Sequence, residues 1–151
     1  MSEPSTIQGG LAVDDRGSVR FVNDFNFEGV KRFYQVQNHQ AGFIRAWHGH
    51  LVEGKYAYVA RGSIRLGVVK LDEEDVYGTD PESIIQMFTL SSEKPQVLWI
   101  PPGYANGFKT LTDDAVVIFF STISLDDSIE MGDDFRFDWD YFFDVWAEDY
   151  R

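Results

Sequence analysis

Short segments rich in β-branched and aromatic residues recur along residues 1–125, and turn-forming residues separate them. Gly, Asp, Asn or Pro bounds each segment, and these residues favour turns and interrupt strands. The segments are 18–22, 31–37, 42–47, 55–60, 63–71, 84–90, 97–100 and 115–122. Regularly spaced short strands, without long amphipathic helical patterns, predict an all-β sandwich or barrel.

Two acidic segments differ from this pattern. Residues 71–83 are charged and rich in turn formers, so we expect an exposed loop between two strands. Residues 126–151 contain ten acidic, two basic and eight aromatic residues. The aromatic residues at 135, 137, 139 and 141 alternate with polar positions and predict a half-buried strand, whereas the apolar residues between 142 and 150 fit a short helix. We expect this tail to cap the core or to pack on a partner subunit.

The composition is that of a folded protein, since 44% of the residues are apolar and 16% are aromatic. The net charge of −12 argues against nucleic acid or an anionic membrane as a partner. The chain has no cysteine, so disulfides, thiolate metal sites and cysteine nucleophiles are excluded. No secretory signal is visible and no apolar run is long enough to span a bilayer, so we expect a cytoplasmic protein.

The negative charge is unevenly distributed. Residues 1–70 have a net charge of +3, whereas residues 71–125 have −7 and residues 126–151 have −8. We expect the acidic loop and tail to lie away from the candidate site residues of the first segment. The overall charge therefore excludes nucleic acid but does not argue against a small phosphorylated substrate.

The most informative stretch ends in His48-Gly49-His50. In a strand, residues i and i+2 share a face, so both imidazoles would point the same way and could begin a metal site. The spacing resembles the first cupin motif, but Lys55 stands where that motif has its glutamate. The second cupin motif resembles residues 101–106, with Asn106 in place of its histidine. A charged lysine offers only donors and repels a cation, so we predict no metal and no cofactor, with a metal-dependent cupin as an alternative.

His48 and Lys55 together suit another chemistry. A histidine is a competent general base near neutral pH, and a nearby lysine can stabilise an oxyanion or anchor a phosphate. This pairing suits proton abstraction beside a carbonyl group, where the carbonyl oxygen becomes an enolate.

At this point the sequence resembles the dTDP-4-dehydrorhamnose 3,5-epimerase family of metal-free cupins over roughly residues 10–140. Residues 14–17 resemble that family's Asp-x-Arg-Gly, residues 35–39 its Gln-x-Asn-His, and residues 45–48 its Arg-Gly-Leu-His, whose histidine is the catalytic base. Residues 53–55 fall on its Gln-x-Lys, and residues 98–108 closely resemble its Leu-Trp-Ile-Pro-Pro-Gly-Phe-Ala-His-Gly-Phe. The resemblance implies one cupin domain over residues 1–151, a jelly-roll barrel at 10–125 followed by a C-terminal segment at 126–151.

The chain also departs from this pattern. Asn106 replaces the family's second active-site histidine, Leu125 or Ser124 replaces its catalytic tyrosine, and Leu66 replaces an aspartate. A second family, the dTDP-4-keto-6-deoxyglucose 3,4-ketoisomerases, carries Arg-Gly-x-His-Ala-His, which residues 45–50 resemble more closely. We therefore expect a nucleotide-sugar epimerase, with a 3,4-ketoisomerase or a non-catalytic sugar- or nucleotide-binding cupin as alternatives.

The resemblance also implies roles for individual residues. His48 would abstract a proton beside the C4 ketone of a nucleotide-diphosphate sugar, Lys55 would stabilise the enolate, and His50, Tyr34 or water would reprotonate it. Asp138 would orient His48. Substrate binding would fall to Arg16, Arg45, Asn38 and Asn106, with the arginines on the diphosphate. These cupins form homodimers in which an N-terminal strand crosses to the partner, and we expect the same here.

Overall fold

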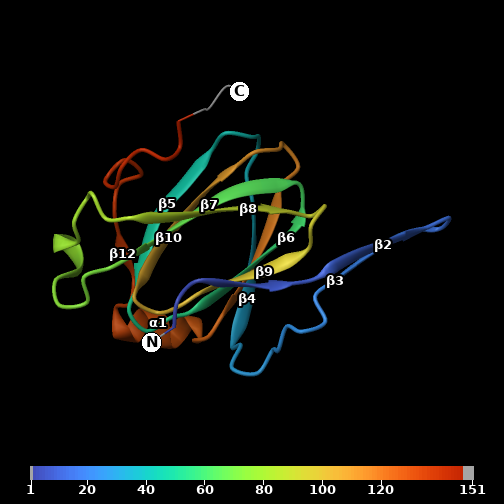
Figure 1. Ribbon diagram of the computed structural model, residues 1–151. Helices are drawn as coiled ribbons and strands as arrows, with labels where there is room; N and C mark the ends of the chain where they lie inside the picture. The colour runs from blue at the N-terminus through green and yellow to red at the C-terminus, as the bar shows by residue number, and fades with distance from the viewer. Residues whose placement is uncertain (1, 148–151) are drawn as a thin grey trace.

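The computed structural model describes residues 2–147 and consists of two five-stranded antiparallel sheets, a two-stranded ribbon and one α-helix (Figure 1). The first sheet has the spatial order β1 (Ser5–Gln8), β9 (Gln96–Ile100), β6 (Lys55–Arg61), β11 (Val116–Ser121) and β4 (Arg32–Gln37). The second has the order β12 (Phe135–Arg136), β5 (Ile44–His50), β10 (Tyr104–Thr110), β7 (Ser63–Lys70) and β8 (Ile85–Ser91). This architecture is the all-β cupin-type jelly roll expected from the sequence.

The main core lies between the inner faces of the two sheets. It is built from alternate residues of their strands, which point to one face because side chains in a strand alternate. Leu66 and Val68 of β7, Leu98 of β9 and Val117 of β11 are fully buried in it. Strand β7 is buried on both faces, since Val69 belongs to a second apolar cluster on the outer side of its sheet.

The C-terminal segment covers that outer face. After β12, Phe137, Phe142 and Trp146 pack on Trp47 of β5, and together they form the centre of the second cluster. The ring of Trp47 lies 5.3 Å from the rings of both Phe142 and Trp146, and its Nε1 donates to the carbonyl of Trp139 at 3.1 Å. The expectation that the tail caps the core is therefore confirmed for residues up to 147.

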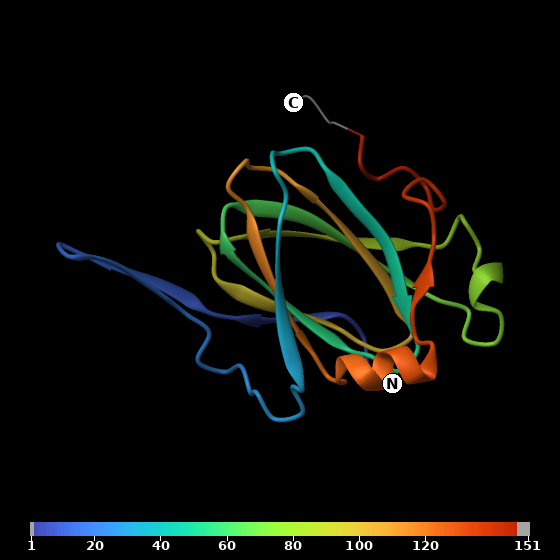
Figure 2. The same cartoon turned by 180° about the vertical axis from the view of Figure 1, so that it is seen from behind.

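The ribbon of β2 (Gly10–Asp14) and β3 (Gly17–Phe21) projects from the body of the molecule, as the two opposite views show (Figures 1 and 2). Neither strand pairs with either five-stranded sheet. Its apolar side chains are exposed, with Val13 at 74% and Val19 at 63% of their full accessibility.

The strands expected at 18–22, 31–37, 42–47, 55–60, 63–71, 84–90, 97–100 and 115–122 are all present, with ends shifted by a few residues. Strands β1, β2 and β10 were not expected, and β12 falls at the start of the strand expected from residue 135. Because β1 and β12 are parts of the sheets, the strands extend beyond residues 10 and 125 in both directions. The acidic stretch at 71–83 is a connection between β7 and β8 that holds one short 3₁₀ helix, Val76–Gly78.

The secondary structure expected for the tail was largely wrong. The strand covers only Phe135–Arg136, and residues 142–147 form no helix, while Tyr150 lies outside the described residues. The helix is instead α1, Leu125–Met131. Ser124 caps its N-terminus by accepting a hydrogen bond from the amide of Asp127, and Gly132 ends it with a left-handed backbone conformation. No helix within residues 2–147 is long and apolar enough to cross a membrane.

Candidate functional site

A cavity of about 470 Å³ lies between the two sheets, with α1 and the residues that follow it on one side. This volume is in the range of ligand-binding pockets. Side chains from strands β4, β5, β6, β10 and β11 point into it. The lining residues are Arg32, Tyr34, Val36, Arg45, His48, His50, Glu53, Lys55, Asn106, Phe108, Phe119, Leu125, Ser128, Ile129, Gly132, Asp134 and Arg136.

A bulge in β5 controls which of its side chains enter the cavity. Asn106 pairs with His48 and Phe108 pairs with Arg45, so two residues of β5 face the single residue Gly107 of β10. A Cβ at Gly107 would lie 2.4 Å from the Cβ of Ala46, so the close approach of the two strands requires glycine there. Without the bulge, Arg45 and His48 would point to opposite faces. With it, Arg45 joins both histidines in the cavity lining.

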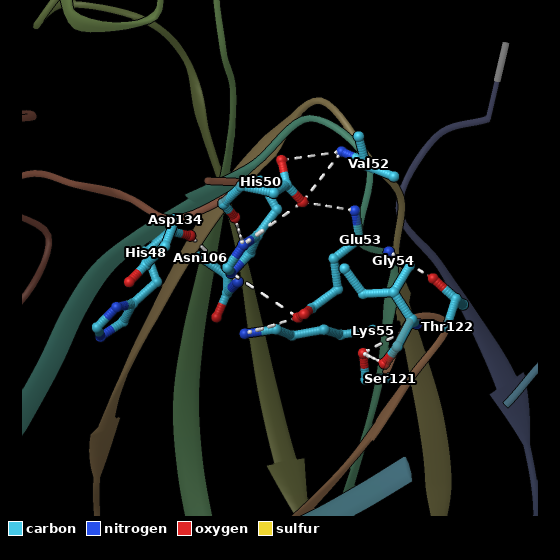
Figure 3. A network of polar contacts seen from close by, with 12 residues as sticks. His48, His50, Val52, Glu53, Gly54, Lys55, Asn106, Ser121, Thr122 and Asp134 are labelled. Carbon is cyan, nitrogen blue, oxygen red and sulfur yellow. Dashed lines mark hydrogen bonds and ion pairs between the residues drawn. The ribbon is translucent and has the colours of Figure 1, made fainter. Parts of the chain in front are cut away.

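The two histidines share a face, as their spacing predicts, but they have different surroundings. Burial lowers the pKa of His48 to about 4, and the positive charges of Lys55 and Arg136 act in the same direction, against the opposing effect of Asp134. The His48 ring is therefore neutral at physiological pH, which is the form a general base needs. In Figure 3 its ring lies to one side of the group formed by His50, Glu53 and Lys55.

His50 is buried and is held by the segment after α1. Its Nδ1 donates to the backbone carbonyl of Asp133 at 2.6 Å, which leaves Nε2 as an acceptor. Burial lowers the pKa of His50, and the charge of Lys55 lowers it further, whereas Glu53 and Asp133 oppose the change. Nε2 lies 3.8 Å from Oε2 of Glu53 (Figure 3).

Asp133 also fixes the turn between β5 and β6. Its buried carboxylate accepts hydrogen bonds from the amides of Leu51 at 2.7 Å, Val52 at 3.1 and 3.2 Å, and Glu53 at 2.9 Å. One acidic residue thus holds the imidazole of His50 through its carbonyl and positions Glu53 through its carboxylate.

Lys55 is buried at the start of β6, and its ammonium group faces the cavity. Nζ lies 3.4 Å from Oε2 of Glu53 and 5.7 Å from the ring centres of both Tyr34 and Phe119. The ring of Tyr34 stacks on Phe119, with ring centres 5.3 Å apart. Asn106 is buried opposite His48 and donates weakly to the carbonyl of His48 at 3.4 Å. The predicted residues His48, His50, Lys55, Tyr34 and Asn106 are therefore brought together in one cavity.

The cavity is positively charged, because its lining holds four basic and two acidic side chains while the pKa of each histidine is lowered. The basic residues are Arg32, Arg45, Lys55 and Arg136, and the acidic ones are Glu53 and Asp134. Asn38 does not line the cavity but accepts a hydrogen bond from Nε of Arg45 at 2.6 Å, so its contact positions that arginine. The surplus of positive charge favours an anionic ligand.

Besides Asn38, two further predicted residues do not line this cavity. Arg16 lies at the exposed tip of the β2–β3 ribbon, where its guanidinium contacts Asp14 at 2.6 Å and lowers the pKa of that carboxyl. Asp138 is exposed after β12 and does not line the cavity. The acidic group that acts on His48 is Asp134 instead.

Sequence reasoning missed part of the site. Arg32, Asp133, Asp134 and Arg136 were not singled out, and Glu53 entered only as part of the stretch 53–55. Arg32 could have been found from its period-two spacing with Tyr34. The expectation that the acidic tail lies away from the site was wrong for its first part, because residues from Leu125 to Arg136 line one side of the cavity. Among residues 2–147, no group of three or more histidine or acidic side chains is placed to hold a metal ion.

Solved structures of nucleotide-sugar epimerases have a similar fold. The dTDP-4-dehydrorhamnose 3,5-epimerase of Elizabethkingia anophelis matches with a TM-score of 0.73 and 17% identity, over 97% of this chain and 82% of that one. The Bacillus anthracis enzyme of the same name, solved with TDP and PPi bound, gives a TM-score of 0.71 and 21% identity over 91% and 80%. A 3′-monoepimerase from Streptomyces bikiniensis in complex with dTDP-quinovose gives 0.64 and 18% over 80% and 64%.

No curated protein sequence matches the chain significantly. The comparisons nevertheless favour an epimerase, an enzyme of the isomerase class, over the 3,4-ketoisomerase alternative. The family profile described as dTDP-4-dehydrorhamnose 3,5-epimerase matches residues 5–145, which is nearly the whole chain. The chain therefore belongs to the dTDP-4-dehydrorhamnose 3,5-epimerase family.

Proposed function

We propose that this protein epimerises a dTDP-4-keto-6-deoxyhexose by removing a proton from a carbon next to the C4 ketone. The observation that carries the proposal is the neutral imidazole of His48 in a positively charged cavity that also contains the Lys55 ammonium. His48 takes the proton, and the electron pair of the C–H bond moves toward the ketone oxygen. Lys55 stabilises the enolate oxygen that forms, and such a positioned charge typically contributes 10²- to 10³-fold in rate.

The remaining basic residues suit the diphosphate. Arg45 offers a planar set of donors that matches paired phosphate oxygens, and its hydrogen bond to Asn38 holds its orientation. Arg32 and Arg136 add positive charge to the lining, and Asn106 offers an amide to the sugar. Nucleotide-bound structures of family relatives support this class of substrate. We place the reaction in the cytoplasm.

The test is proton exchange. The protein is incubated with dTDP-4-keto-6-deoxyglucose in heavy water, and the signals of H3 and H5 are followed by NMR. We expect deuterium at one or both carbons together with the inverted sugar, and we expect a His48→Gln variant to lose both. A ketone shifted to C3 would support the ketoisomerase, and binding of dTDP without any exchange would support a non-catalytic binding protein.

We also propose a homodimer in which the β2–β3 ribbon of one protomer packs on the other. An isolated two-stranded ribbon is marginally stable in water, and here Val13 and Val19 are exposed on it. The outer face of the first sheet is also apolar, with Phe27 at 62% and Phe33 at 69% accessibility. In the proposed dimer, the ribbon that covers this face also brings Arg16, at its tip, to the partner's cavity.

Mixing two inactive variants tests the dimer directly. Arg16→Ala loses the cation at the tip of the ribbon, and His48→Gln loses the base. In a mixed dimer one cavity combines an intact His48 with an intact Arg16 from the partner. Random exchange of protomers should restore about a quarter of the wild-type activity, since half of the dimers are mixed and each has one complete site. A monomer in sedimentation, or a mixture that remains inactive, would refute the ribbon exchange.

A further inference from the structure

The cavity contains two buried acceptor atoms that face each other without a donor between them. Oε2 of Glu53 and Nε2 of His50 are 3.8 Å apart. Within residues 2–147 neither atom makes a hydrogen bond, and Oε2 has only an ion-pair contact with Nζ of Lys55 at 3.4 Å. The side chains are 1% and 9% exposed, respectively, so bulk water does not satisfy them. An unpaired buried polar atom is costly, and two facing acceptors are best satisfied by a proton shared between them.

The backbone determines which histidine nitrogen can carry this proton. A carbonyl oxygen only accepts, so the 2.6 Å contact with Asp133 requires a proton on Nδ1 of His50. A second proton on Nε2 would create an imidazolium directed at Glu53. The titratable groups that face His50 are Glu53 on the turn that follows β5, Asp133 after α1, Lys55 on β6 and His48 on its own strand. Arg32 on β4 lies 3.5 Å from the other oxygen of Glu53.

Inversion at a carbon requires a second proton-transfer group besides His48, because the proton must return on the other face of the planar enolate. Few lining side chains can supply it. Lys55 forms an ion pair with Glu53 and is assigned to the enolate oxygen. Ser128 lies on α1, and its alcohol is too weak an acid. Tyr34 is the remaining rival, with its ring stacked on Phe119. Only His50 combines an exchangeable proton with an unpaired, buried acceptor in the lining.

We propose that His50 donates the proton that completes the inversion and that Glu53 positions and stabilises its protonated form. The proposal rests on the proposed function. His48 and His50 are two residues apart on one face of β5, and both side chains line the same cavity, so both imidazoles face one bound sugar. His48 removes one proton, and the enolate carbon then takes the proton from Nε2 of His50, whose N–H electron pair returns to the ring. The turnover leaves His48 protonated and His50 neutral. Before the next cycle His48 gives its proton to water and Nε2 of His50 takes a proton from water.

The test separates exchange from inversion. His50→Gln keeps an amide that can donate to the carbonyl of Asp133 but has no transferable proton. We expect this variant to retain exchange of the abstracted proton within about threefold of wild type, while inversion falls 10²- to 10⁴-fold, the usual contribution of a general acid. Asp140→Asn, an exposed change outside the cavity, is the matched control. If the wild-type protein shows neither exchange nor inversion, the proposed epimerase function fails, and the role of His50 fails with it.

Glu53→Gln is the isosteric test of the positioning role. Losing its charge removes a group that raises the pKa of His50, so the alkaline limb of the kcat/KM profile should move to lower pH. A merely structural role would lower the rate without moving the limb. Tyr34→Phe should retain inversion. Inversion that survives in His50→Gln but is lost in Tyr34→Phe would overturn the proposal.

Discussion

Asp133→Asn should destabilise the fold strongly although it changes only one atom. The buried carboxylate accepts four short amide contacts from residues 51–53, two on each oxygen. An asparagine keeps one acceptor and places an NH₂ group opposite the remaining amides. At least one strong bond is lost, to Leu51 at 2.7 Å or to Glu53 at 2.9 Å, and a donor then faces a donor. Hydrogen bonds to a charged group contribute about 1.5–3 kcal/mol each, so we expect a loss of about 2–4 kcal/mol.

The assay is urea unfolding followed by tryptophan fluorescence, with Asp134→Asn as the matched control. Asp134 is exposed and contacts Arg136 in a surface ion pair of 3.2 Å, which contributes about 0–1 kcal/mol. For a chain of this size the Asp133 variant should also melt about 5–15 °C lower. Equal urea midpoints for the two variants would show that the carboxylate does not hold the turn, and the account of how His50 and Glu53 are positioned would fail with it.

Three further outcomes follow from the structure. Because the native pKa of His48 is about 4, the activity of the wild-type protein should fall tenfold per pH unit only below about pH 4, as a pH-rate profile can check. The neutral His48 contributes its full stability above the unfolded pKa of about 6.5, and this contribution is lost as the pH falls toward 4, as acid unfolding of wild type and His48→Gln can check. Lys55→Met, which keeps the aliphatic chain over Tyr34, should lower kcat about 10²- to 10³-fold in the exchange assay, and an unchanged rate would exclude Lys55 from enolate stabilisation. Leu98→Ala, at a fully buried position, should cost about 2–5 kcal/mol in urea unfolding, and a smaller loss would mean that the core closes around the cavity.

The strands could be predicted wherever a run of β-branched and aromatic residues stood between turn formers. Strand β10 was missed because Asn106 and Gly107 have low strand propensity and follow two prolines, although the fold needs that glycine for the close approach of β5. Helix α1 spans seven residues, and its apolar pair Leu125 and Ile129 is too brief a pattern to predict a helix. Its capping residues Ser124 and Gly132 were the only local signal, and they were not used.

The site could be predicted where residues share one strand face, as His48 and His50 do. Lys55 was also found, through its motif spacing. Asp133 could not be found in this way, because its role depends on a long-range contact with the turn at 51–53 that no local pattern encodes. The same limit applies to Asp138, which was chosen by resemblance. Asp134 and not Asp138 acts on the imidazole of His48, because a shift of four residues in this irregular segment changes which carboxylate faces the cavity.

Strand β5 carries the catalytic imidazoles on its inner face and contacts the C-terminal segment on its outer face. Trp47 and His48 are adjacent, yet Trp47 is fixed on the outer face by Phe137, whose backbone it bonds at 3.0 and 3.1 Å, while His48 lines the cavity. Substitutions in the aromatic residues that pack on Trp47 can therefore shift the imidazoles without changing any group that touches the sugar. Adaptation to a new substrate can therefore involve residues on the outer face of the sheet. Sequence changes that accompany altered specificity should be sought there as well as in the cavity.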